Sequence, residues 1–84
     1  MINKNDYHKL KKYLKYKSKP EINELLDYIS LNDYEKDLFL SWYNGDTRIK
    51  MSLEHYICDD TCTNYLKKIF SKINNYFEYY NISF

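Results

Sequence analysis

Glycine and proline are almost missing from this chain, with Gly45 and Pro20 as the only examples among 84 residues. All-β domains need many tight turns, and glycine and proline commonly build them. Their scarcity excludes a sheet-rich fold and favours helices joined by short connections. We therefore expect an all-α fold of about five helices, with residues 1–84 forming a single domain.

Long apolar runs are also missing. No segment approaches the roughly 18 apolar residues of a membrane span, and residues 1–6 lack the apolar stretch of a signal peptide. We expect a cytoplasmic protein with no membrane partner. Its two cysteines, Cys58 and Cys62, are then expected to stay reduced.

The chain has no overall excess of charge, because 13 basic and 12 acidic side chains leave a net charge of +1. The charges are nevertheless unevenly spread. Residues 1–19 carry seven lysines and one aspartate, whereas residues 20–47 carry one lysine and seven acids. The net charge thus gives no indication of a nucleic-acid partner, although the distribution permits local basic surfaces.

Aromatic residues, and residues whose codons are rich in A and T, are abundant instead. Eleven residues are tyrosines, which pack a ring while keeping a hydroxyl near water and so suit a small domain. Asn, Lys, Ile, Tyr and Phe make up more than half of the chain. Their codons are rich in A and T, which indicates a low-GC genome such as that of a Firmicute, its plasmid or its phage.

Helical spacing of apolar residues and capping residues predict where the helices lie. Gly45 is well placed to end a helix, because glycine readily adopts the left-handed backbone conformation found after helix ends. The lysines within residues 6–17, the first expected helix, form either a solvated face or an arm that contacts phosphates. The tail 76–84 reads as a helix that covers the core or pairs with a second subunit, or as a strand of a wing. We expect helices over residues 6–17, from Pro20 to about Ser30, from Asn32 or Asp33 to Tyr43, from Asp46 or Thr47 to about His55, and from Asp59 or Asp60 to Tyr80.

Residues 47–66 meet the requirements of a helix-turn-helix, in which a first helix braces a second one that lies in the DNA major groove. Ser52 is the small residue where the helices approach each other, and Ile57 is the apolar residue that plugs the turn. Cys62 and Leu66 anchor the second helix to the core. A winged helix with a small C-terminal hairpin is the alternative form of this fold.

The same region resembles region 4 of bacterial sigma factors and the small phage and plasmid regulators similar to it. The resemblance covers about residues 31–73 without a gap. Two departures lie in the turn, where the family has leucine and glycine at His55 and Tyr56. Cys58 replaces a serine cap, so that Asp59 is expected to cap the last helix. The resemblance is carried by Leu31-Asn32-Asp33-Tyr34-Glu35-Lys36-Asp37-Leu38, Trp42-Tyr43-Asn44-Gly45, Thr47, Met51-Ser52, Ile57-Cys58, Thr61-Cys62, Leu66 and Lys72.

The resemblance implies a set of DNA contacts. Thr63, Asn64 and Lys67 would reach base edges, and Asp60 could accept a hydrogen bond from cytosine N4 although phosphates repel it. Phosphate contacts, which position the protein without reading sequence, would come from Arg48, Lys50 and Lys68. The alternative is that all of these are ordinary exposed helix residues.

Metal binding and catalysis are both disfavoured. A structural zinc site needs four ligands, usually as two close pairs, and His55, Cys58 and Cys62 have only the distant His8 to join them. A Cys–His nucleophile needs a base and an orienting group in one cleft, whereas both cysteines fall at turn or core positions of the motif. We expect no enzyme activity and no cofactor.

The sequence therefore predicts a DNA-binding protein that acts as a transcriptional regulator or as an accessory factor at a plasmid or phage site. A homodimer fits this function, because one short recognition helix reads few base pairs of double-stranded DNA. One alternative is a winged-helix protein of plasmid partition or conjugation, such as a relaxosome accessory factor. Another is a protein–protein module that binds the transcription machinery, which the acidic stretch 20–47 and the pair Asp59-Asp60 favour.

Overall fold

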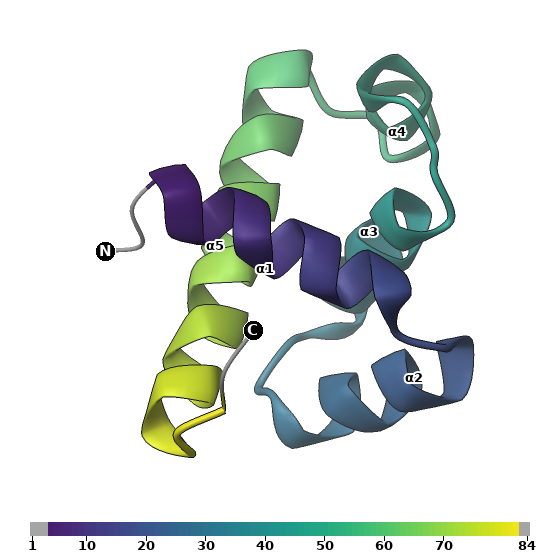
Figure 1. The fold of residues 1–84 in the computed structure, drawn as a ribbon. Helices are drawn as coiled ribbons and strands as arrows, with labels where there is room; N and C mark the ends of the chain where they lie inside the picture. Colours follow the sequence, from purple (N-terminus) through teal and green to yellow (C-terminus); the bar gives the residue numbers. More distant parts are fainter. Residues whose placement is uncertain (1–3, 83–84) are drawn as a thin grey trace. The chain divides into compact units, whose positions relative to one another are not determined.

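The computed structural model describes residues 4–82, and this part of the chain is all-helical (Figure 1). The expectation of an all-α fold with about five helices is confirmed. The tail is helical through Tyr79, so that residues 4–82 contain no strand and no wing. No described helix is long and apolar enough to cross a membrane. The helices are α1 (Lys4–Tyr16), α2 (Lys19–Tyr28), α3 (Asp33–Tyr43), α4 (Arg48–Glu54) and α5 (Asp59–Tyr79).

Side-chain caps explain where three of these helices begin. The Ser18 hydroxyl accepts a hydrogen bond from the backbone N–H of Glu21 at the start of α2. Asn32 caps α3 in a reciprocal box, because its Oδ1 accepts from Glu35 N at 2.8 Å while Glu35 Oε1 accepts from Asn32 N at 3.2 Å. The Thr47 hydroxyl accepts from Lys50 N at 3.1 Å and caps α4. Each cap satisfies a backbone donor that has no partner within its helix.

Helix α5 begins one residue earlier than a capping aspartate allows. Its first residue is Asp59, and the carbonyl of Cys58 accepts the first helical hydrogen bond, from Cys62 N at 2.9 Å. Cys58 therefore occupies the N-cap position, and the expectation that Asp59 or Asp60 caps this helix is wrong. Both carboxylates lie in the first turn instead, where the positive end of the helix dipole favours them.

Helices α3, α4 and α5 end in the same way, with one residue of positive φ after the helix. These residues are Gly45 (φ 90°), Tyr56 (φ 55°) and Asn81 (φ 55°). In each case the following backbone N–H bonds back to a carbonyl five residues earlier, as in a Schellman motif. These bonds are Asp46 N to Ser41 O at 3.1 Å, Ile57 N to Ser52 O at 3.1 Å and Ile82 N to Phe77 O at 2.8 Å.

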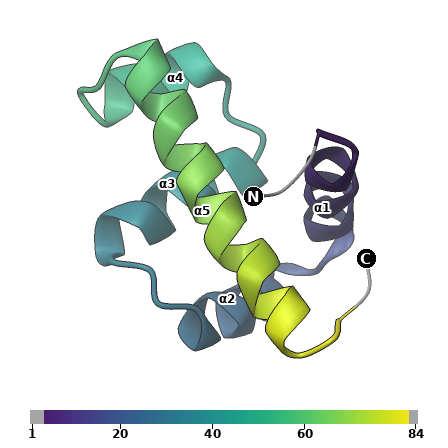
Figure 2. The same ribbon diagram turned by 90° about the vertical axis from the view of Figure 1, so that its left-hand side faces the viewer.

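The chain divides into two compact units, which both include part of α5. Unit 1 comprises Met1–Ser30 and Phe70–Phe84, and unit 2 comprises Leu31–Ile69. Figure 2 shows α5 as one continuous helix. Its residues up to Ile69 belong to unit 2, and those from Phe70 belong to unit 1.

Unit 1 has a core of aliphatic and aromatic side chains from α1, α2 and the second half of α5. Two edge-to-face ring pairs join α1 to α5, with centroids 5.3 Å apart for Tyr7–Phe70 and 5.6 Å apart for Tyr13–Phe77. The buried apolar residues of this unit are Leu10, Leu14, Ile22, Leu26, Ile29, Phe70, Ile73 and Phe77.

Unit 2 contains the predicted helix-turn-helix and α3. The Tyr34 ring lies against two other rings, His55 at 5.5 Å and Tyr65 at 5.4 Å between centroids. It thereby connects α3 with the turn after α4 and with the first half of α5. The buried apolar residues of this unit are Leu31, Leu38, Phe39, Met51, Cys62, Leu66 and Ile69.

Candidate nucleic-acid interface

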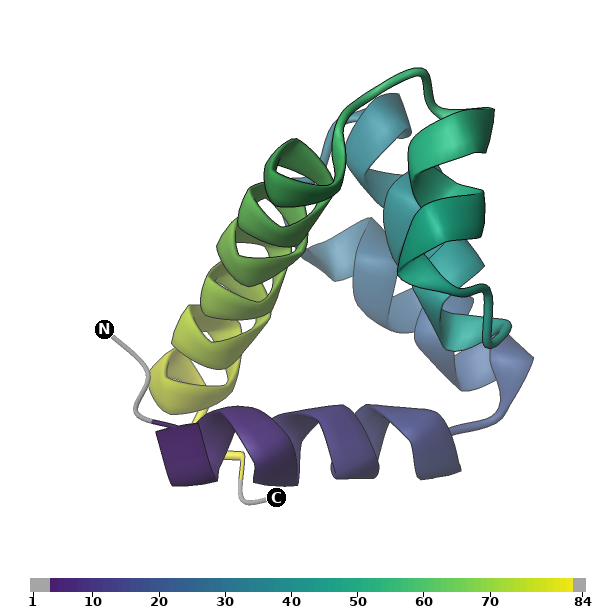
Figure 3. The ribbon, with the colours of Figure 1, turned by 90° about the horizontal axis from the view of Figure 1, so that it is seen from above.

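The segment predicted to bind DNA consists of α4, a four-residue turn (55–58) and the first half of α5, as Figure 3 shows. Ser52 lies where the two helices approach each other, because its Oγ is 3.3 Å from Asp59 Oδ1. The same Oγ is 2.9 Å from Arg48 O, so that one hydroxyl proton serves two acceptors. A larger side chain at position 52 would separate the start of α5 from α4.

The anchors of α5 lie where the sequence predicts them. Cys62 is completely buried and Leu66 is 3% exposed. Ile57 is only half-buried, which makes it a partial plug of the turn. Burial raises the pKa of the Cys62 thiol and keeps it neutral, as suits a core position.

The polar side of α5 is opposite these anchors. At 100° per residue, positions 60, 63, 64, 67 and 68 fall within an arc of about 140° centred away from positions 62 and 66. Asp60, Asn64, Lys67 and Lys68 are exposed. Asn64 and Lys68 line a shallow hollow together with Thr61 and Tyr65.

Two of the predicted contact residues are engaged within the chain. The Thr63 hydroxyl donates to Asp59 O at 3.0 Å, and its side chain is half-buried. The Lys50 ammonium lies 3.3 Å from Asp46 Oδ1 and 3.8 Å from Glu54 Oε1. A phosphate would therefore have to compete with these two carboxylates for the Lys50 ammonium.

The local charge balance is even. Residues 46–68 carry four basic and four acidic side chains. Arg48, Lys67 and Lys68 are exposed and make no ion pair within residues 4–82. They are the three cations of this segment that remain available to an anionic partner.

Comparisons of the chain with protein-family models, curated proteins and solved structures found no match.

Cys58 is the exposed thiol of the candidate interface. Its Sγ lies 2.9 Å from Thr61 Oγ1. This hydrogen bond, together with the Thr61 backbone N–H, lowers the pKa of the Cys58 thiol, against the opposing charge of Asp60. Among residues 4–82, no three His, Cys, Asp or Glu side chains are grouped so that they could hold a metal ion.

An apolar patch on α4 was not foreseen from the sequence. Ile49 and Leu53 are 69% and 72% exposed and lie one helical turn apart, and Tyr56 in the following turn is 94% exposed. The i, i+4 spacing of the two aliphatic residues was visible in the sequence, but spacing alone does not say whether a helix stripe meets a core or solvent.

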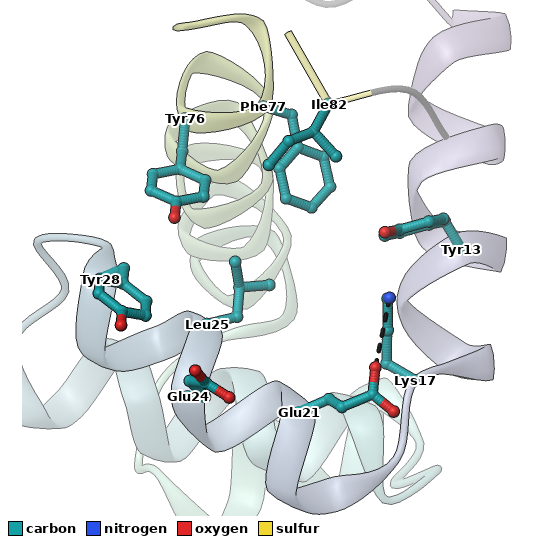
Figure 4. A pocket seen from close by; sticks show the side chains of 9 residues that line it. All are labelled: Tyr13, Lys17, Glu21, Glu24, Leu25, Tyr28, Tyr76, Phe77 and Ile82. Atoms are coloured by element: carbon teal, nitrogen blue, oxygen red, sulfur yellow. Dashed lines mark ion pairs between the residues drawn. The ribbon is translucent and has the colours of Figure 1, made fainter. Parts of the chain in front are cut away.

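A second unforeseen feature is a hollow in unit 1 (Figure 4), bounded by α1, α2 and the end of α5. The Lys17 ammonium at its rim lies 3.3 Å from Glu21 Oε2 and 4.8 Å from the centroid of the Tyr13 ring. Hydrogen bonds to Tyr13 and Glu21 raise the pKa of Lys17. The lining residues are Tyr13, Lys17, Glu21, Glu24, Leu25, Tyr28, Tyr76, Phe77 and Ile82.

Proposed function

We propose that this protein binds double-stranded DNA through a helix-turn-helix formed by α4 and the first half of α5, and that it regulates transcription or serves as an accessory factor on a plasmid or phage. The observation that carries the proposal is the division of α5 into two sides. Cys62 and Leu66 are buried on one side, while Asn64, Lys67 and Lys68 are exposed on the other. A helix held in this way presents polar side chains to a groove without giving up its packing.

The exposed residues have separate roles in this proposal. Asn64 reads a base edge, for which its amide is suited by its adjacent donor and acceptor. Lys67 contacts a base edge beside it, and Lys68 and Arg48 contact phosphates. Two copies of the chain bind together, because one short helix reads few base pairs.

Fluorescence anisotropy with a labelled duplex from the region upstream of the gene tests this proposal. Asn64→Ala is expected to weaken specific binding by about 1–3 kcal/mol. Lys68→Ala is expected to reduce the slope of log K against log salt by about 1.8, or about 0.9 for each of the two bound copies, because each copy makes one fewer phosphate contact.

The chain offers matched controls for both variants. Asn75 is exposed on the same helix but lies in unit 1, and Lys19 is an exposed lysine at the start of α2. Asn75→Ala and Lys19→Ala are expected to bind as the wild type does. The proposal is wrong if the wild type shows no salt-dependent binding to duplex DNA, or if Asn64→Ala and Asn75→Ala bind equally well.

The patch of Ile49, Leu53 and Tyr56 favours a second candidate, a module that binds another protein of the transcription machinery. Exposed apolar side chains gathered on one helix and its turn are a common mark of a protein interface. The even charge balance of residues 46–68 fits this candidate as well. Pull-down of purified RNA polymerase by wild type but not by Ile49→Ser/Leu53→Ser, with no DNA binding by either, would support it over the first.

A further inference from the structure

Two helix faces of unit 1 carry opposite charges, and each consists of two charged residues and one tyrosine. On α1, Lys9, Lys12 and Tyr16 are exposed and fall within about 60° of one another at 100° per residue, away from buried Leu10 and Leu14. We call these three residues the basic face.

The acidic face lies on α2 and consists of Glu24, Asp27 and Tyr28, which are all exposed. They fall within an arc of about 100°, away from buried Ile22 and Leu26. Each face thus presents two charges of one sign and one tyrosine. Within residues 4–82 none of these four charged side chains has an ion-pair partner.

The contact that would join such faces already exists once within the unit. The Lys17 ammonium lies between a carboxylate of α2, Glu21, and the ring of Tyr13. Glu24 and Tyr28 line the same hollow, and they offer a carboxylate and a tyrosine ring with no cation between them (Figure 4). A second ammonium group would find the same pair of partners there.

We propose that a second copy of this chain supplies that cation, and that unit 1 forms a twofold dimer in which the basic face of each copy meets the acidic face of the other. Both faces belong to one unit, so that a twofold axis makes the contact twice. The proposal depends on the dimeric part of the proposed function but not on DNA binding.

Sedimentation equilibrium without DNA is the test. Exposed ion pairs are individually weak and are screened by salt. At low salt, the mass of the wild type is expected to rise with concentration from 10.4 kDa towards twice that value, and raised salt is expected to restore the monomer. Lys9→Glu/Lys12→Glu and Glu24→Lys/Asp27→Lys are each expected to weaken association at least about tenfold, because like charges then meet at both contacts.

An equimolar mixture of the two variants separates this surface from a folding defect. The reversed basic face of one variant meets the reversed acidic face of the other, while the second contact is that of the wild type. The mixture is expected to dimerise as strongly as the wild type. Asp37→Lys, an exposed charge reversal on α3 in unit 2, is expected to leave association unchanged.

Two results would overturn the proposal. One is a wild type that stays monomeric at all concentrations in low salt. The other is a mixture that stays monomeric although each variant alone unfolds cooperatively. A wild type that binds DNA but stays monomeric would contradict this proposal alone, and a wild type that dimerises but shows no salt-dependent DNA binding would contradict DNA binding alone.

Discussion

At the scale of single residues, Tyr56 combines an unfavourable backbone conformation with a side chain that makes few packing contacts. Its φ of 55° is a conformation in which a side chain meets the following carbonyl oxygen, at a cost of about 1–2 kcal/mol for most L-residues. Its ring is 94% exposed and recovers little of that cost by packing. The position is one that glycine occupies with less strain.

Tyr56→Gly is therefore expected to raise the free energy of unfolding by about 1 kcal/mol, because relief of backbone strain exceeds the entropy that glycine loses on folding. Urea denaturation measures the change. Lys12→Gly, at an exposed site within α1, is expected to lower the same quantity by about 1 kcal/mol. Equal destabilisation by the two changes would show that the Tyr56 ring holds the turn.

The sequence predicted some residues of the candidate site well and others poorly. Cys62 and Leu66 are buried as expected, because helical spacing locates a core stripe reliably. The ion pairs of Lys50 with Asp46 and Glu54 were readable from their i, i+4 spacing but were not anticipated. The buried Nε2 of His55 and hydroxyl of Tyr34, which have no hydrogen-bond partner among the described residues, depend on tertiary packing that spacing does not encode.

At the scale of helices, the start of α3 has the strongest local determinant. Asn32 and Glu35 satisfy each other's backbone N–H groups, and Glu35 is only 4% exposed. Because α3 contributes Leu38 and Phe39 to the core of unit 2, a frayed first turn would loosen that unit.

Asn32→Ala is expected to lower the free energy of unfolding by about 1 kcal/mol, since the amide oxygen no longer accepts from Glu35 N. Chemical denaturation followed by circular dichroism measures this change. Asn75→Ala, at an exposed position within α5, is the matched control and is expected to stay within about 0.5 kcal/mol of the wild type. A similar loss in both variants would assign the effect to residue type and not to the cap.

Most helices could be predicted from the sequence, but their ends less well. Ser18, Asn32 and Thr47 are standard caps, and the structure uses all three. The capping residue of α5 was misassigned because the preference for oxygen-bearing caps pointed to an aspartate, whereas Cys58 holds the N-cap position. The exposure of Ile49 and Leu53 could not be read from their spacing, because the pattern is the same for a core stripe and a surface patch.

At the scale of the whole molecule, α5 is common to both compact units. The first eleven of its residues, Asp59–Ile69, belong to unit 2, and Phe70–Tyr79 belong to unit 1. Each unit would lose a core-forming part of this helix if the other unfolded, because helix formation is cooperative along the chain.

Unfolding is therefore expected to be a single transition. Trp42 is the only tryptophan and lies in unit 2, so that its fluorescence reports on that unit, whereas far-ultraviolet circular dichroism reports on all helices. The two urea curves are expected to share one midpoint and one slope. Separate midpoints would mean that the units unfold independently and that residues 1–84 do not act as one domain.

The three helix ends with positive φ allow the energetic cost of this backbone conformation to be compared between residue types within one protein. Glycine, tyrosine and asparagine occupy equivalent places at positions 45, 56 and 81, each followed by the same backbone closure. Placing each of the three residue types at each of the three positions would yield nine free energies of unfolding that can be compared directly. Comparing the three residue types at one position would give the contribution of each side chain to the free energy of unfolding. Comparing one residue type at the three positions would give the effect of each location on the same quantity.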